Sequence, residues 1–204
     1  IESMFSGKSG IFRGTMTGGK VPYSGRGVVT PDEGADYDQI GIPPMIATKI
    51  FRPTIEDQMR QNGESEENIK GLFERAEQTH QSKITDEDRT VINRALAKAD
   101  VRVVANRQPS LHESSLLAFR PYSSKDSSIK VNPMVAKGYN MDHDGDTMTV
   151  FGLNDSRISK IAETEIGAGS SAGTHMPRHQ ETSINQPAKE SLWGLMNIIS
   201  KRKN

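Results

Sequence analysis

The chain has 204 residues and a formal net charge of zero, with 33% hydrophobic residues and a mean hydropathy of −0.62. It contains no cysteine, which excludes a disulfide framework and a thiolate zinc site, and no apolar run approaches the ~20 residues of a membrane span. The apolar content is low for a free-standing domain; long polar insertions would explain this, but we expect one piece of a larger assembly. The absence of cysteine fits a reducing, cytoplasmic compartment.

Charge is unevenly distributed along the chain. Residues 1–30 are basic and rich in glycine, whereas residues 31–100 are acidic. A basic, glycine-rich segment can approach phosphates closely, and an acidic one is repelled by them. Both segments could equally be solvated faces, and charge alone leaves that alternative open.

The first half of the chain predicts one strand followed by helices. Gly63 interrupts a polar helical stretch, which indicates two surface helices rather than one. Thr85 and Asp88 have the spacing of an N-terminal capping box. The expected elements are a strand at 27–30, a turn at 31–34, a short helix at 45–51, two helices within 55–79 and a helix after 85.

The sequence pattern changes from helical to strand-like after Asp100, where β-branched residues alternate. This pattern is typical of strands, and short strands separated by turns follow it. The expected elements are strands at 101–105, 115–120, 128–132 and 147–152, a helix at 155–166, a long loop at 167–187 and a final helix at 188–200.

Three aspartates occur at every second position, as Asp142, Asp144 and Asp146. Neighbouring carboxylates repel one another, so their convergence is costly unless a cation compensates. Gly145 permits a tight turn that could bring the three side chains together. Hard oxygen ligands with open positions suit Mg²⁺ and therefore phosphoryl or nucleotidyl transfer.

The acidic run has two other interpretations. A calcium loop needs glycine at its sixth position and glutamate at its twelfth, but counting from Asp142 these are Thr147 and Leu153. A solvated acidic turn is common for so short a motif. Met148 and Val150 argue against it, because they predict a strand that holds the loop rigidly.

The run Tyr-Asn-Met-Asp-His-Asp-Gly-Asp-Thr-Met at 139–148 resembles the Asn-Ala-Asp-Phe-Asp-Gly-Asp-Gln-Met signature of one family. That family is the largest subunit, β′ in bacteria, of multisubunit DNA-directed RNA polymerases. Residues 106–112 and 118–121 resemble its Asn-Arg-x-Pro-Thr-Leu-His and Ala-Phe-x-Pro segments. Further collinear matches lie at 7–13, 23–26, 41–43 with 51–53, and 187 with 192–195.

The resemblance implies an α+β fold, a double-psi β-barrel with helical insertions and flanking loops. We expect four parts. They are a template-contacting lead-in with the first barrel elements (1–53), a helical insertion (54–100), the catalytic barrel region with the metal loop (101–153), and post-barrel helices with a long loop (154–204).

The resemblance also implies roles for individual residues. The three aspartates would be catalytic and hold Mg²⁺, while Asn140 and Arg107 would approach the ribose hydroxyls of the nucleotide. The expected contacts to template DNA are Lys20 and Arg26, with Lys8 and Arg13 as weaker candidates.

The implied function is Mg²⁺-dependent nucleotidyl transfer from NTPs to the 3′ end of nascent RNA on a DNA template. The implied partners are the rest of the largest subunit and a β-like subunit, without which the chain would be inactive. Two alternatives stay open: an RNA-templated RNA polymerase with the same barrel, and a non-catalytic assembly module. His143 and Thr147 depart from the family pattern, which suggests a divergent, bacteriophage-encoded polymerase.

Overall fold

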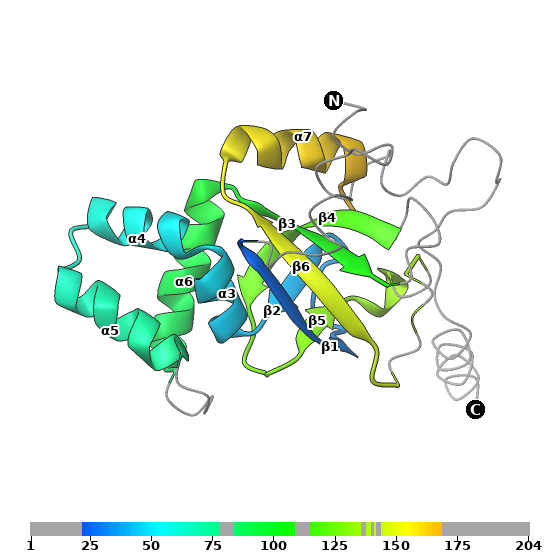
Figure 1. Cartoon of the computed structure of the whole chain (residues 1–204), viewed down its shortest axis with the longest axis horizontal. Coiled ribbons are helices and arrows are strands. Elements are labelled where there is room, and N and C mark those ends of the chain that lie inside the picture. The colour runs from blue at the N-terminus through cyan, green and yellow to red at the C-terminus, as the bar shows by residue number, and fades with distance from the viewer. Residues whose placement is uncertain are drawn as a thin grey trace, which may run out of the picture.

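Six strands close into a barrel at the centre of the computed structural model (Figure 1). The structure describes residues 22–77, 84–108, 115–135, 138–139, 141 and 144–168. The strands are β1 (Ser24–Pro31), β2 (Gln39–Ile42), β3 (Arg102–Arg107), β4 (Leu116–Ser123), β5 (Ile129–Val131) and β6 (Thr147–Leu153). The helices are α3 (Pro44–Ile50), α4 (Arg52–Gln61), α5 (Glu66–Glu77), α6 (Asp86–Ala99) and α7 (Ser156–Ile166), with a 3₁₀ turn at Pro133–Val135.

The strand order around the barrel is β1-β5-β2-β4-β3-β6, and it mixes parallel with antiparallel neighbours. β1 pairs parallel with β5, and β2 pairs parallel with β4. β6 lies antiparallel between β1 and β3, with Val28 opposite Thr147 and Arg107 opposite Met148. The barrel therefore draws its strands from both sides of the helical stretch 44–99, and it brings the start of β6 beside the end of β3.

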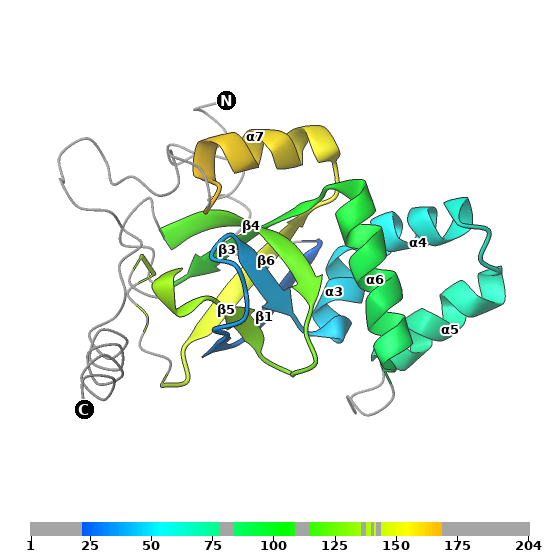
Figure 2. The ribbon, with the colours of Figure 1, turned by 180° about the vertical axis from the view of Figure 1, so that it is seen from behind.

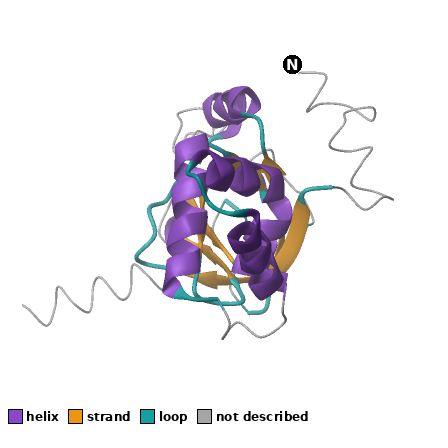
Figure 3. Ribbon diagram, turned by 90° about the vertical axis from the view of Figure 1, so that its left-hand side faces the viewer, coloured by secondary structure: helices purple, strands orange, loops and turns teal. Residues whose placement is uncertain are grey.

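The helices α3 to α6 form a layer on one side of the barrel. Figure 2 shows this layer from behind, and Figure 3 shows it facing the viewer with the strands beyond it. The polar helices α4 and α5 are not merely surface helices, because each contributes a buried stripe to the main core. The stripe consists of Ile55, Met59, Ile69, Leu72 and Phe73.

Local sequence signals explain where these helices begin and end. Gly63, with φ 80°, separates α4 from α5. The capping box at the start of α6 is present: Asp88 N donates to Thr85 Oγ1 at 3.1 Å, and Thr85 N donates to Asp88 Oδ2 at 3.2 Å. Arg75 on α5 then donates to both oxygens of Asp88, at 3.0 and 2.6 Å. These bonds fix α5 against α6.

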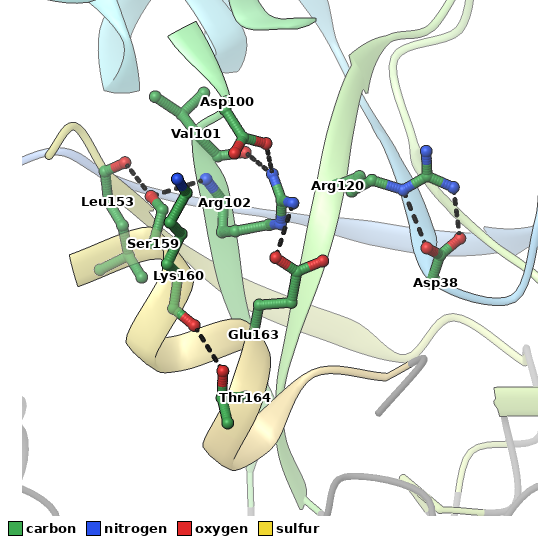
Figure 4. A network of polar contacts seen from close by, with 10 residues as sticks. All are labelled: Asp38, Asp100, Val101, Arg102, Arg120, Leu153, Ser159, Lys160, Glu163 and Thr164. Atoms are coloured by element: carbon green, nitrogen blue, oxygen red, sulfur yellow. Dashed lines mark hydrogen bonds and ion pairs between the residues drawn. The ribbon is translucent and has the colours of Figure 1, made fainter. Parts of the chain in front are cut away.

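α7 covers the outer face of β3, β4 and β6 through a second, smaller apolar cluster that includes Val104, Phe151 and Ala162. Beside it, the buried Arg102 guanidinium donates to Asp100 Oδ1 at 2.7 Å and to Glu163 Oε2 at 2.9 Å (Figure 4). These ion pairs attach α7 to the N-terminal end of β3.

The expected fold class, an α+β barrel with helical insertions, is confirmed. All four strands predicted after Asp100 are present, and the helix predicted at 155–166 is α7. The prediction missed β2. The final helix at 188–200 and most of the loop at 167–187 lie outside the described residues. Among the residues that the structure describes, no helix is long and apolar enough to cross a bilayer.

Candidate active site

Residues 144–146 are the described part of the acidic turn, which leads directly into β6. Asp144 is exposed, Asp146 is half-buried, and Gly145 between them has φ 116°, which side-chain-bearing residues rarely adopt. Met148 and Val150, which follow on β6, are fully buried. Asp146 is further fixed through its main chain, because Val29 N on β1 donates to Asp146 O at 2.9 Å. The described part of this loop is thus held by two strands of the barrel.

Tyr139, which precedes the turn in the sequence, is bound to two strands of the barrel, and the sequence assigned it no role. Its hydroxyl donates to Ala105 O on β3 at 3.0 Å and accepts from Leu117 N on β4 at 3.2 Å. Its ring stacks on Phe119 with centroids 6.3 Å apart. Burial raises the pKa of the Tyr139 phenol, so it stays protonated and able to donate. The sequence feature that could have pointed to Tyr139 is an aromatic residue with a hydroxyl at the start of a polar run.

Arg107 and Asp146 form a bidentate ion pair. Arg107 Nε donates to Asp146 Oδ2 at 2.9 Å and Nη2 donates to Oδ1 at 2.8 Å, while Nη1 lies 3.4 Å from Tyr139 O. Each of the two paired side chains is 17% exposed. The pair forms because Arg107 ends β3 opposite Met148, two residues after Asp146. Two of the residues selected from the sequence are therefore in direct contact.

Arg26 lies on another part of the surface. It stands opposite Thr149 on β6, and its Nε and Nη2 donate to Thr147 Oγ1 at 3.1 and 2.8 Å. Side chains at alternate positions of a strand point to opposite faces, so Arg26 lies on the outer face and the buried Met148 points inward. The structure therefore does not place Arg26 against Asp146.

The other selected residues lie outside the described part of the chain. They are Asp142, Asn140, Lys20, Lys8 and Arg13. Among the described residues, no group of three His, Asp or Glu side chains is placed to hold a metal ion. The third carboxylate of the predicted cluster, Asp142, is not among those residues.

The donor chemistry of the turn fits the cation that the family implies. The side chains of Asp144 and Asp146 offer hard carboxylate oxygens and neither sulfur nor imidazole nitrogen. Mg²⁺ prefers such ligands and is usually held by one or two carboxylates, together with water and substrate phosphates. Asp144 is exposed and so accessible to such groups. Among the described residues, Asp144 and Asp146 are thus the carboxylates of the turn that could hold such a cation.

Comparison with known proteins shows the family of this chain. Residues 18–167 match the family model described as RNA polymerase Rpb1, domain 2. The DNA-directed RNA polymerase subunit β′ of Clostridium tetani is 35% identical over 150 residues, covering 74% of this chain and 12% of the relative. The subunit β′ of Finegoldia magna is 34% identical over 152 residues, again 74% of this chain and 12% of the relative.

A third relative matches the full length of the chain. The subunit β′ of Deinococcus radiodurans is 28% identical over 207 residues, which cover 100% of this chain and 13% of the relative. The chain thus spans about an eighth of the length of the relatives it matches. The match at 18–167 contains every described strand and helix and the acidic turn. The chain belongs to the family of the largest subunit of RNA polymerase, in the segment represented by Rpb1 domain 2.

Proposed function

We propose that this chain supplies the catalytic carboxylates of a DNA-directed RNA polymerase. The observation that supports this most is the position of Asp144 and Asp146 on a glycine turn that enters β6, beside Arg107 at the end of β3. The matched relatives carry the name DNA-directed RNA polymerase subunit β′. The reaction would be nucleotidyl transfer from NTPs to the RNA 3′ end.

In this proposal Asp142, Asp144 and Asp146 hold Mg²⁺. The ion would lower the pKa of the attacking 3′ hydroxyl and neutralise negative charge that develops on the phosphoryl group. The turn would keep Asp146 in place before substrate arrives, because Val29 N on β1 binds its carbonyl oxygen and β6 follows directly. Restrained ligands cost less reorganisation during the reaction.

The basic residues would orient the nucleic acids. Arg107 and Asn140 would approach the ribose of the nucleotide, and Arg26, Lys20, Lys8 and Arg13 would contact the template strand. Arg26 is suited to a phosphate because it is exposed on the outer face of β1. Thr147 already orients its guanidinium.

The chain would act only within a multisubunit complex. Other parts of the largest subunit and a β-like subunit would complete the site, since this chain corresponds to about an eighth of its relatives. The departures at His143 and Thr147 support a divergent polymerase, encoded by a bacteriophage and located in the host cytoplasm.

The test is RNA synthesis by the purified native complex. Asp144→Ala should abolish extension of an RNA primer on a DNA template, because one metal ligand is lost. Asp126→Ala is the matched control, since Asp126 is also an exposed carboxylate on a barrel turn, where it pairs with Lys130. It should leave extension near the wild-type rate.

Template choice separates the alternative enzyme. The complex should extend RNA on DNA and not on an RNA template of the same sequence. Efficient RNA-templated synthesis would favour the RNA-dependent alternative. If the complex with Asp144→Ala synthesises RNA at the wild-type rate, the chain is instead a non-catalytic assembly module.

A further inference from the structure

We propose that Arg107 competes with the divalent cation for Asp146 and thereby weakens metal binding at the acidic turn. This inference rests on the proposed function, because it takes Asp146 as a metal ligand. It assigns Arg107 a role toward the metal in addition to the expected contact with the nucleotide.

The geometry of the pair is that of a strong charge-assisted contact. Both oxygens of Asp146 accept a hydrogen bond from one planar guanidinium, at 2.8 and 2.9 Å. Both side chains are 17% exposed, so solvent screens this pair less than a surface ion pair. A cation that takes Asp146 as a ligand must use at least one of these two oxygens.

Sharing is unfavourable for two reasons. Each oxygen already directs electron density toward an N–H group, which reduces its donation to a metal. The guanidinium also carries a full positive charge within hydrogen-bond distance of the ligand atoms, and it repels a divalent cation there. Filling the site therefore requires Arg107 to weaken or leave its contact with Asp146.

The structure offers Arg107 another acceptor and keeps Asp146 in place without it. Arg107 Nη1 lies 3.4 Å from Tyr139 O, so the guanidinium can keep a backbone partner as it turns from the carboxylate. The main chain of Asp146 is bound to Val29 N at 2.9 Å, and this bond does not involve Arg107. Loss of Arg107 should thus remove the competitor without displacing the ligand, and metal binding should become tighter.

The experiment is a Mn²⁺ titration of the metal-depleted native complex, followed by electron paramagnetic resonance. The part of the bound-Mn²⁺ signal that is lost in Asp146→Asn is assigned to the site at the acidic turn. We expect Arg107→Gln to bind Mn²⁺ roughly fivefold to tenfold more tightly than wild type, the effect of removing one charge-assisted contact. Arg107→Lys keeps the charge but loses the bidentate fork, so its affinity should lie between the two.

Arg120→Gln is the matched control. Arg120 makes the same two-bond contact with Asp38, Nε to Oδ2 and Nη2 to Oδ1, both at 2.8 Å (Figure 4). It lies on β4 toward the other end of β3, because Val103 pairs with Phe119 and Asn106 pairs with Leu116. Removal of this charge should leave the Mn²⁺ affinity at the acidic turn unchanged.

The outcomes separate the two proposals. If Asp146→Asn leaves Mn²⁺ binding intact, Asp146 is not a ligand, and the metal site of the proposed function fails together with this inference. If Asp146→Asn abolishes the signal but Arg107→Gln and Arg107→Lys bind Mn²⁺ as wild type or more weakly, only the competition is overturned. Subunit stoichiometry of each purified complex shows whether the variant has assembled, and the lysine variant remains informative if the glutamine variant does not assemble.

Discussion

The hydroxyl of Tyr139 donates a hydrogen bond to the carbonyl oxygen of Ala105 at 3.0 Å, at a point where β3 pairs with β4. The hydroxyl oxygen of Tyr139 also accepts a hydrogen bond from Leu117 N at 3.2 Å, and Leu117 is the residue opposite Ala105. The Tyr139 hydroxyl thus bridges two strands, while its carbonyl receives Arg107 from the active-site side. One residue links the barrel wall to the acidic turn.

Tyr139→Phe should destabilise the chain by about 1–3 kcal/mol. The change removes only one oxygen, but it leaves the buried Ala105 carbonyl and Leu117 amide without this partner. Urea unfolding of the chain would measure the loss. Tyr37→Phe is the control, because Tyr37 is 45% exposed and its hydroxyl removal should change stability by less than about 0.5 kcal/mol. Equal stability of the two variants would contradict the bridging role.

Gly152→Ala should destabilise the barrel by about 3 kcal/mol, at the upper end for overpacking. A Cβ at Gly152 would overlap Ile50 and lie 3.2 Å from Phe51 Cε1, and both residues are fully buried. Gly63→Ala meets no atom within 4 Å, so its cost should be only the ~1–2 kcal/mol of a left-handed backbone. Chemical denaturation of both variants would compare the costs. A smaller loss for Gly152→Ala than for Gly63→Ala would show that α3 yields at this contact.

Because of Asp88, the free energy of unfolding should vary with pH in the acidic range. Burial by itself would raise the pKa of the Asp88 carboxyl, but hydrogen bonds from Arg75 and Thr85 outweigh it and hold the pKa below its ordinary value. A carboxyl whose pKa is lower in the folded state stabilises the fold at pH values above its unfolded pKa of ~3.9. This stabilisation is lost as the pH falls through the folded pKa.

Asp88→Asn should therefore cost about 1–3 kcal/mol at neutral pH, through weakened bonds to Arg75 and Thr85. The difference from wild type should shrink as pH falls below ~4. Unfolding free energies measured from pH 7 to pH 3 would check both statements. A difference that stays constant over this range would mean that the carboxylate charge is not responsible.

Arg26→Gln should weaken binding of the native complex to template DNA similarly for different sequences. The proposed contact is to a phosphate, so the slope of log affinity against log salt should fall in magnitude by about 1. Arg157→Gln removes another exposed arginine, on α7, and should leave the slope unchanged. DNA binding measured at several salt concentrations distinguishes the two. An unchanged slope for Arg26→Gln would remove Arg26 from the template contacts.

Several elements could be predicted from the sequence because their signals are local. The capping box at Thr85 and Asp88, the break at Gly63 and the alternating strand after Asp100 depend on neighbours within a few residues. β2 was not predicted, because a four-residue strand containing Gly41 has little local signal. It exists because β4 and β5 supply its hydrogen bonds.

The sequence by itself indicated the family and selected the three aspartates and Arg107 as candidate site residues, because these inferences depend on residue types in a fixed order. Only the tertiary structure decided which of them meet. The antiparallel register of β3 and β6 sets Arg107 against Asp146 although 39 residues separate them. The register of β1 and β6 leaves Arg26 on the outer face. Register is determined by barrel closure and by core residues far apart in the chain, so no local pattern contains it.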